Sequence, residues 1–273
     1  MYVIYNSRLL AQQDFNLALP NRGFYFNDGF FETLIWADDT LRYGTHHVAR
    51  MQQAAAALGL ELPAVLRDLA SLKALFRQLI AAHSLPQARV RLQIWRGSGG
   101  LYTPETNSAE FVMTAQPFAP NPTLAARADF AQAVRTQPSS FAFCKGPNAL
   151  TYVLAGHERQ HRGLDELILL DPAGNLAEAG AAAIFWIKDG QLYTPALATG
   201  CVAGVRRAHL LAVAQAYGIP YTEGLYQPAD LLKAEAAFTA NVATIRPLAQ
   251  VADTPLPSEH HPLLHELCTW EAR

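Results

Sequence analysis

Several short segments of the chain are dense in apolar residues, many of them aromatic or β-branched, and each of these segments predicts a β-strand. Two of them lie near the start, "MYVIYN" at 1–6 and "FFETLIW" at 30–36, and both are rich in aromatic and β-branched side chains. Two more, "ARVRLQIWRG" at 88–97 and "AEFVMTAQPF" at 109–118, flank a glycine-rich loop. The first third of the chain therefore predicts strands that form a sheet.

Stretches rich in alanine and leucine lie between the strands and predict helices. The first two cover about 46–60, with Gly59 as a candidate C-cap, and about 63–83. Later in the chain, helices are expected at about 150–162 and in "GVRRAHLLAVAQAY" at 204–217. Strands and helices that alternate in this way, without repeats, predict an α+β fold.

A proline-rich segment, "QPFAPNPTLAA" at 116–126, interrupts this pattern. Proline stiffens and extends the backbone, as in a linker between domains. We therefore predict a small α+β domain at 1–115, an interdomain linker at 116–125 and a larger α+β domain at 126–273.

The composition is that of a globular protein with a sizeable core. The chain has 273 residues, of which 51% are hydrophobic and 16% charged, with a formal net charge of −2. This charge gives no sign of binding to nucleic acid or to an anionic membrane. Three cysteines without paired spacing suit a reducing compartment, and no leader or membrane span is visible. We expect a soluble, cytoplasmic protein.

Two charged side chains stand in apolar surroundings. In "FAFCKGPNALTYV" at 141–153, Lys145 alternates with Phe141 and Phe143, so a strand there would place all three on one face. Glu178 interrupts "LAEAGAAAIFW" in the same way. Either these side chains pair or reach water at strand ends, or a dry pocket holds them for chemistry. A desolvated lysine loses its proton readily and can form a Schiff base.

Two further patterns indicate chemistry on their own. "HERQH" at 157–161 matches a zinc-binding helix, in which His157 and His161 would be ligands and Glu158 the general base. The helix ends directly afterwards and a third ligand is unassigned, so a solvated helix end is the simpler interpretation and we assign no metal. The glycine-flanked helix start "CVAGVRR" at 201–207 would suit a single phosphate, although an ordinary loop is the simpler interpretation of this pattern alone.

Taken in order, these segments resemble the class IV aminotransferase family, the fold-type IV enzymes that use pyridoxal 5'-phosphate (PLP). The resemblance covers nearly the whole chain. It runs through "NRGFYFNDGFFETLIW" (21–36), "HHVARM" (46–51), "KGPNALTYVLAGHERQHRGLDELILLD" (145–171), "AEAGAAAIFWIKDGQLYTP" (177–195), "GCVAGVRRAHLLAVA" (200–214) and "AFTANVATIRPL" (237–248). It implies a two-domain fold like that of D-amino-acid aminotransferase, an amino substrate and a homodimer.

The same resemblance implies roles for individual residues. Lys145 matches the lysine that forms the Schiff base with PLP and moves the proton at the substrate carbon. Glu178 matches the carboxylate that keeps the pyridine nitrogen protonated. Arg50 matches the arginine that binds the cofactor phosphate. The other positions implied for the cofactor are Val202, against the ring, and Gly204, Val205, Arg206 and Asn241, around the phosphate.

Arginines are the candidates for binding a substrate carboxylate, because the guanidinium fork matches that group. Arg96 is the first choice since it opens the glycine-rich loop, and Arg91 is the second. Solvated arginines or surface ion pairs are the alternative interpretation. Phe31 is expected to form a pocket wall.

The reaction type remains open between two classes. Branched-chain transaminases usually carry a tyrosine five residues after the lysine, where this chain has Leu150. The family commonly has a glycine before the Asp-Gly of the first motif, where this chain has Asn27. The pattern Lys-x-x-Asn-x-Leu resembles aminodeoxychorismate lyases and D-amino-acid transaminases, and "RGSGG" at 96–100 resembles the lyase loop. We favour 4-amino-4-deoxychorismate lyase, which releases 4-aminobenzoate and pyruvate in folate biosynthesis. The alternative is transamination of a branched-chain or D-amino acid.

Overall fold

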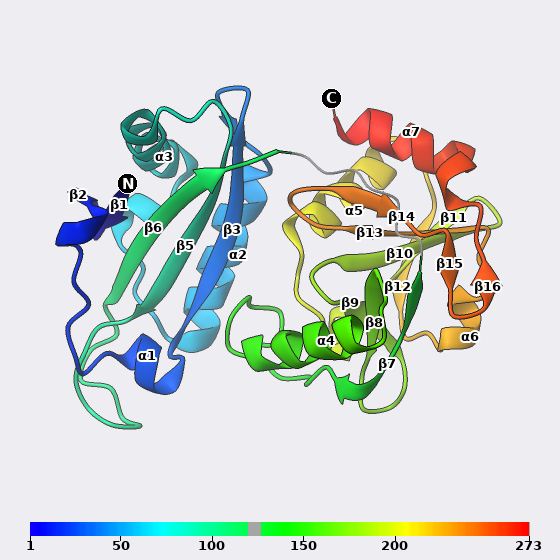
Figure 1. Cartoon of the computed structure of the whole chain (residues 1–273), viewed down its shortest axis with the longest axis horizontal. Coiled ribbons are helices and arrows are strands. Elements are labelled where there is room, and N and C mark those ends of the chain that lie inside the picture. The colour runs from blue at the N-terminus through cyan, green and yellow to red at the C-terminus, as the bar shows by residue number, and fades with distance from the viewer. Residues whose placement is uncertain (120–126, 273) are drawn as a thin grey trace. The chain divides into compact units, whose positions relative to one another are not determined.

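The computed structural model describes residues 1–119 and 127–272 and divides into two compact units (Figure 1). Unit 1 comprises Met1–Ala119 together with Cys144–Pro147, and unit 2 comprises the rest of the chain. The strand Ala109–Pro117 overlaps the first two residues of the predicted linker. The remainder of that linker, from 120 to 125, lies outside the described residues.

Unit 1 contains a six-stranded antiparallel sheet in the order β2-β1-β6-β5-β3-β4. Its strands are β1 (Tyr2–Tyr5), β2 (Arg8–Ala11), β3 (Gly29–Ala37), β4 (Thr40–Leu41), β5 (Ala88–Arg96) and β6 (Ala109–Pro117). Its helices are α1 (Arg22–Phe26), α2 (Gly44–Leu58) and α3 (Leu69–His83), with short 3-10 turns at Gln12–Asp14 and Ala64–Leu66.

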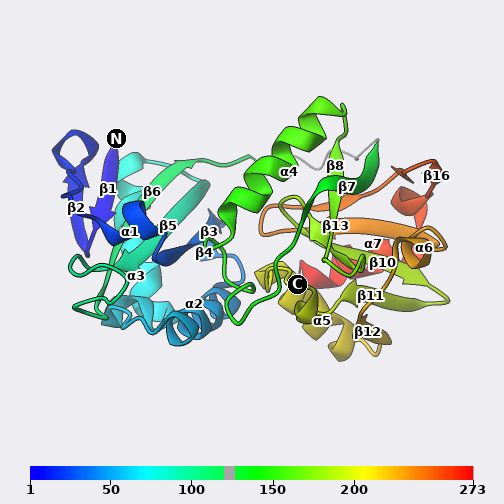
Figure 2. The ribbon, with the colours of Figure 1, turned by 90° about the horizontal axis from the view of Figure 1, so that it is seen from below.

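Helices α2 and α3 lie along the same face of this sheet (Figure 2). Strand β5 shows why, since Val90, Leu92 and Ile94 are buried while Arg89 and Arg91 are exposed on the other face. The two predicted helices are confirmed, with Gly59 as a left-handed C-cap of α2. Helix α3 begins later than expected because the side chain of Asp68 accepts a hydrogen bond from the N–H of Ser71, which caps the helix.

Unit 2 contains two five-stranded sheets, in the orders β12-β11-β10-β13-β14 and β16-β15-β7-β8-β9. The strands are β7 (Ala128–Arg135), β8 (Glu166–Leu170), β9 (Leu176–Ala179), β10 (Ala183–Lys188), β11 (Gln191–Pro195), β12 (Tyr221–Gly224), β13 (Ala236–Ala240), β14 (Ile245–Pro247), β15 (Gln250–Val251) and β16 (Thr254–Pro255). The helices are α4 (Ala149–His161), α5 (Val205–Ala216), α6 (Pro228–Leu231) and α7 (Pro262–Glu271), with 3-10 turns at Leu197–Thr199 and Ser258–His260.

These elements of unit 2 form layers, which the alternation of side chains along β10 and β8 defines. On β10, Phe185 packs toward α5 and α7, whereas Trp186 packs between the two sheets. On β8, Ile168 faces the space between the sheets and Leu167 faces the cluster beside α4. Helix α4 and the α5–α7 pair therefore cover opposite faces of the paired sheets (Figure 1).

The predicted strand leading to Lys145 is wrong. Strand β7 ends at Arg135, and the segment up to the start of α4 consists of turns. Its backbone makes isolated hydrogen bonds and no strand ladder; for example, the carbonyl of Phe143 accepts from the N–H of Ala203. The alternation with Phe141 therefore reflects the turns of this segment and not a pleated strand.

Candidate cofactor and active site

Lys145 lies in a turn that unit 1 holds by its backbone. The carbonyl oxygen of Lys145 accepts a hydrogen bond from the N–H of Phe31 on β3, at 2.7 Å. The side-chain amide of Asn27 donates to the carbonyls of Gly146 and Pro147, at 3.0 and 3.1 Å. Asn27 itself adopts the left-handed conformation that asparagine tolerates. The lysine backbone is thus fixed against the start of β3.

The side chains of Lys145 and Arg91 lie beside the ring of Phe31. The Nζ atom of Lys145 is 5.5 Å from the ring centroid, and the Cζ atom of Arg91 is 3.7 Å from it. Arg91 also donates to the side-chain oxygen of Gln93, at 3.0 Å. Burial and the neighbouring charge of Arg89 lower the pKa of Arg91. Unit 1 therefore brings Lys145, Phe31 and one candidate arginine together.

Arg50, the predicted phosphate ligand, forms a buried network with Glu32 and His47. Its Nε donates to Glu32 Oε1 at 2.8 Å, its second guanidinium nitrogen donates to Oε2, and His47 Nδ1 lies 2.7 Å from Oε2. Burial alone would raise the pKa of Glu32, but Arg50 and His47 lower it to about 2. Burial lowers the pKa of His47 despite the nearby carboxylate. Glu32 is therefore ionised, and it orients Arg50.

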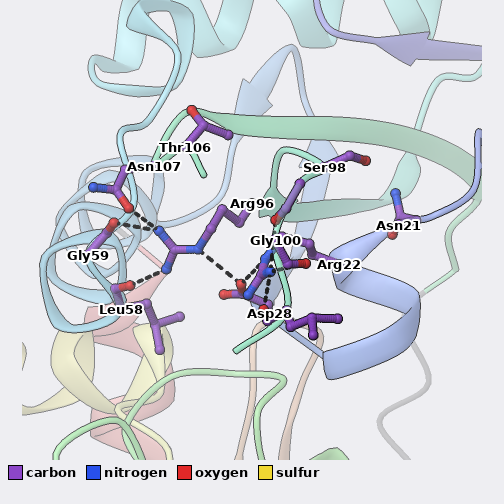
Figure 3. A network of polar contacts seen from close by, with 12 residues as sticks. Asn21, Arg22, Asp28, Leu58, Gly59, Arg96, Ser98, Gly100, Thr106 and Asn107 are labelled. Carbon is purple, nitrogen blue, oxygen red and sulfur yellow. Dashed lines mark hydrogen bonds and ion pairs between the residues drawn. The ribbon is translucent and has the colours of Figure 1, made fainter. Parts of the chain in front are cut away.

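Arg96, the first choice for a substrate carboxylate, is surrounded by protein acceptors (Figure 3). It donates to the carbonyls of Leu58 and Gly59 at 2.6 and 2.9 Å, to Asn107 Oδ1 at 2.6 Å and to Asp28 Oδ2 at 3.0 Å. A guanidinium has five N–H donors, so these contacts occupy four of them. Arg96 thus ties the end of α2 to the sheet, and we correct the order of preference to Arg91.

The glycine-rich loop after Arg96 is held by a second arginine that the sequence did not single out. Asp28 accepts from Arg22 Nε at 2.8 Å as well as from Arg96, so one carboxylate joins both (Figure 3). Arg22 also donates to the carbonyls of Gly99 and Leu101, at 3.0 and 2.5 Å. Gly99 has a φ of 119°, which only glycine adopts readily. The loop therefore has a fixed shape within unit 1.

In unit 2, the pairing of β9 with β8 decides where Glu178 points. Leu170 pairs with Leu176 and Leu169 pairs with Glu178, so Ala177 is an extra residue on β9. Such a β-bulge moves the following side chains to the other face of the strand. Leu176 accordingly packs between the sheets, whereas Glu178 shares the face of Leu169, beside α4.

Two neutral donors converge on one oxygen of the buried Glu178. The hydroxyl of Tyr152 donates to Oε1 at 2.6 Å, and the N–H of Val202 donates to the same atom at 3.2 Å. Burial and the charge of Glu178 raise the pKa of Tyr152, so its phenol stays protonated. A carboxylate in an apolar layer needs such donors to remain ionised.

The segment after Val202 begins a helix, as the sequence predicted. Gly204 is the N-cap of α5 and provides no side-chain acceptor, and Val205 is the first helical residue. The first turn of such a helix presents backbone N–H groups and the positive end of the helix dipole. This start therefore has the properties of a phosphate site.

The side chains of Arg206 and Asn241 shape this end of α5. Arg206 donates to the carbonyl of Asn241 at 3.2 Å and forms an ion pair with Glu271 on α7. The side-chain oxygen of Asn241 accepts from the N–H groups of Ala243 and Thr244, at 2.9 and 3.2 Å. Unit 2 therefore joins the predicted helix start and the predicted Asn241 turn through Arg206.

The HERQH motif does not form a metal site in the structure. His157 and His161 lie toward solvent at the end of α4, while Glu158 accepts hydrogen bonds from the N–H groups of Gln132 and Ala133, at 2.8 and 2.9 Å. Its glutamate thus joins α4 to β7. Across residues 1–119 and 127–272, no group of three or more His, Cys, Asp or Glu could hold a metal ion.

Comparison with known families decides between a PLP site and a zinc site. The family model for amino-transferase class IV matches residues 29–251. The chain belongs to this family. Class IV aminotransferases are PLP-dependent enzymes, so this protein is one as well, with an α+β fold of type IV.

Relatives of the chain include D-alanine aminotransferases and branched-chain-amino-acid aminotransferases. The D-alanine aminotransferase of Listeria monocytogenes serotype 4b (strain F2365) is 26% identical over 88% of this chain and 84% of its own. A putative branched-chain-amino-acid aminotransferase of Methanocaldococcus jannaschii is 25% identical over 92% of this chain and 88% of its own. No described helix of this class IV chain combines the length and hydropathy needed to cross a bilayer.

A solved class IV structure shares the fold. The branched-chain aminotransferase of Thermoproteus uzoniensis with norvaline has a TM-score of 0.88 at 21% identity, covering 100% of this chain and 94% of that one. At this identity the likeness establishes the fold of the chain and leaves its substrate open.

Several residues of this class IV site were missed in the sequence. Glu32 interrupts the apolar segment "FFETLIW" just as Glu178 interrupts its own, so the same criterion would have found it. Tyr152, Arg22 and Asn27 carried no such signal, because their roles depend on contacts distant in sequence. Such contacts become visible only in the folded chain.

Proposed function

We propose that the protein is an α-amino-acid transaminase that acts on D-amino acids or branched-chain amino acids. The observation that carries the proposal is the buried Glu178, which neutral donors hold in a dry layer of unit 2. The relatives support transamination, since they are D-alanine and branched-chain aminotransferases. The lyase reaction favoured from the sequence has no such support, and transamination replaces it as the first choice.

The residues fit a PLP molecule. Within unit 2, Glu178 would pair with the pyridine nitrogen, Val202 would pack on the ring, and the start of α5 from Gly204 to Arg206 would bind the phosphate with Asn241. Arg50 of unit 1 remains a predicted ligand of the phosphate. Bound PLP supplies an electron sink for the pair of electrons that a substrate C–H bond releases. An ionised carboxylate such as Glu178 favours the protonated form of the ring nitrogen.

Lys145 would hold the cofactor and move the proton at the substrate α-carbon. The bonds from its backbone to Phe31, and from Asn27 to the next two carbonyls, fix the start of its side chain. A fixed backbone limits the positions that the amine can reach, and this is how position contributes to rate. Lys145 and Glu178 are therefore the proposed catalytic residues.

Arg91 is the proposed ligand of the substrate carboxylate. It lies on the ring of Phe31, which Lys145 also approaches, and the nearby Arg89 adds a second positive charge. An anionic group placed beside two arginines gains from both charges. Arg96 remains a weaker candidate, because protein acceptors occupy most of its donors.

We also propose that the enzyme is a homodimer that forms through unit 1. Helix α1 exposes Phe24 and Tyr25, and the glycine-rich loop exposes Leu101 and Tyr102, at 73, 53, 77 and 92%. Phe26 contacts Tyr102 with ring centroids 5.7 Å apart, so the two segments form one apolar surface. Surfaces of this kind mark interaction sites. Sedimentation velocity of the protein and of Tyr102→Asp would test it, and a monomeric wild type would contradict it.

A cytoplasmic location is the expected setting. The three cysteines are free thiols. Burial raises the pKa of Cys144 to about 11 and that of Cys201 to about 12, so both thiols stay protonated. Free thiols are typical of reducing compartments.

The decisive experiment offers the purified protein a panel of D- and L-amino acids with 2-oxoglutarate or pyruvate, beside aminodeoxychorismate. We expect amino transfer from D-alanine or from a branched-chain amino acid. Replacement of Lys145 by Ala should abolish it. Release of 4-aminobenzoate without amino transfer would instead establish the lyase, and no turnover with any donor would contradict the proposal.

A further inference from the structure

Tyr152 connects α4 to the carboxylate proposed for the cofactor. It lies in the first turn of α4, and its ring packs against the apolar cluster of Ala155, Leu167 and Leu169. From there its hydroxyl reaches Glu178 Oε1 at 2.6 Å. The side chain thus combines an apolar body in the core with a polar tip on a functional group.

The contact has two chemical consequences. A hydroxyl that donates to a carboxylate stabilises the ionised form, without cancelling its charge as an arginine would. Val202 donates to the same oxygen, so the two donors together fix the rotation of the carboxylate about its last bond. The bulge at Ala177 turns Glu178 toward α4 and makes this contact feasible.

We propose that Tyr152 is a positioning residue that acts through Glu178 to make the protein select the protonated pyridine ring. The inference rests on the proposed function, which assigns Glu178 to the ring nitrogen. An ionised and correctly turned carboxylate attracts a ring N–H, but gains little from a ring that has C–H in that place. Tyr152 therefore contributes to discrimination between such rings.

The test compares two ligands in two proteins. The ligands are PLP and its 1-deaza analogue, in which C–H replaces the ring nitrogen, and the proteins are the wild type and Tyr152→Phe. This substitution removes the hydroxyl and keeps the packed ring. Dissociation constants come from the quenching of tryptophan fluorescence in protein freed of cofactor.

The wild type should bind PLP more tightly than the analogue. Tyr152→Phe should weaken the binding of PLP by about 10-fold, the size expected for a hydrogen bond to a charged group. It should change the binding of the analogue by less than about twofold. Covalent attachment to Lys145 is common to both ligands, so it cancels in the ratio of their two dissociation constants.

Tyr226→Phe is the matched control. Tyr226 also lies in unit 2, packs on the cluster between the two sheets and has its hydroxyl 3.5 Å from the carbonyl of Thr222. Its removal should leave the ratio unchanged. In Glu178→Gln, the further change Tyr152→Phe should alter the ratio by less than about twofold, because the two residues act as one unit.

Each result has a distinct meaning. Equal losses for both ligands in Tyr152→Phe would show a purely structural role and overturn the inference. An unchanged ratio in Tyr152→Phe, with the preference lost in Glu178→Gln, would also overturn it and leave the proposed function intact. A wild type that binds neither ligand would overturn both.

Discussion

Two glutamates interrupt apolar strands of this enzyme, one in each unit, and their surroundings differ. Glu32 on β3 accepts hydrogen bonds from the guanidinium of Arg50 and lies beside His47. Glu178 on β9 accepts from a phenol and from a backbone N–H. Both side chains are buried, and both lie within hydrophobic segments of the sequence.

The difference shows how the partners of a buried carboxylate indicate its role. The guanidinium of Arg50 compensates the charge of Glu32, and the ion pair fixes the orientation of the Arg50 side chain. The hydroxyl of Tyr152 and the N–H of Val202 stabilise the carboxylate of Glu178 without adding a positive charge of their own. We infer that Glu32 acts through Arg50 and mainly stabilises unit 1, whereas Glu178 is proposed to act on the cofactor itself. Five substitutions or conditions test this comparison.

The largest effect is expected on activity, for Glu178→Gln. The amide keeps the shape and can still accept from Tyr152, but it carries no charge to favour a protonated ring. The rate of amino transfer should fall by about 100- to 1000-fold, as for the loss of one preorganised electrostatic partner. Steady-state assays with the best donor of the panel measure this. The thermal midpoint of the apoprotein should change little, and a large drop would contradict the division of roles.

Glu32→Gln should have the opposite balance. It leaves the buried guanidinium of Arg50 without its carboxylate, and breaking a buried ion pair in this way costs about 3–5 kcal/mol. Urea unfolding of the apoprotein, followed by circular dichroism, measures the loss. Asp68→Asn provides a control, because that carboxylate is exposed and caps α3. A loss no greater than that of the control would show that the network does not stabilise unit 1.

Acid should affect the same network. The pKa of Glu32 is lowered from 4.5 to about 2 in the folded protein. A depressed pKa stabilises the fold above the unfolded value, and the stabilisation is lost as the pH falls from about 4.5 toward 2. The free energy of unfolding should therefore decline over this range in the wild type. Its slope should be smaller in Glu32→Gln, and equal slopes would exclude Glu32 as the cause.

The sequence predicted much of the fold but only part of the site. Helices that the sequence predicted, such as α2 and α5, agree with the structure. Lys145 and Glu178 were recognised in the sequence because a charged side chain in an apolar segment needs a partner, solvent or a functional pocket. Local sequence patterns are sufficient to identify such residues.

What the sequence could not supply depends on contacts between distant residues. The bulge at Ala177 reverses the face of Glu178, and no letter in "LAEAG" indicates it. The turn that contains Lys145 is held by β3, more than a hundred residues earlier in the chain. Arg96 resembled a ligand because it opens a glycine-rich loop, but its acceptors come from the end of α2.

Glu271 extends the comparison to a third carboxylate. It forms an ion pair with Arg206, and both side chains are mostly buried. If pairing with arginine marks a structural role, Glu271→Gln should destabilise the protein by about 2 kcal/mol, the range for hydrogen bonds between charged groups. The affinity for PLP should fall only a few-fold, through the start of α5. A loss of activity as large as that of Glu178→Gln would contradict the inference that a carboxylate paired with arginine has a structural role.

The smallest effect is expected for Asn27→Gly, which tests neutral donors in unit 1. Asn27 is left-handed, with a φ of 52°, and glycine accepts this conformation, so the change removes only the bonds to Gly146 and Pro147. Two neutral hydrogen bonds contribute about 1–2 kcal/mol, and the relief of backbone strain offsets part of it. We expect a net loss of about 1 kcal/mol in urea unfolding. Because the lysine turn becomes looser, the rate of amino transfer should fall more than stability alone predicts. An unchanged rate would show that Phe31 and β3 suffice to position Lys145.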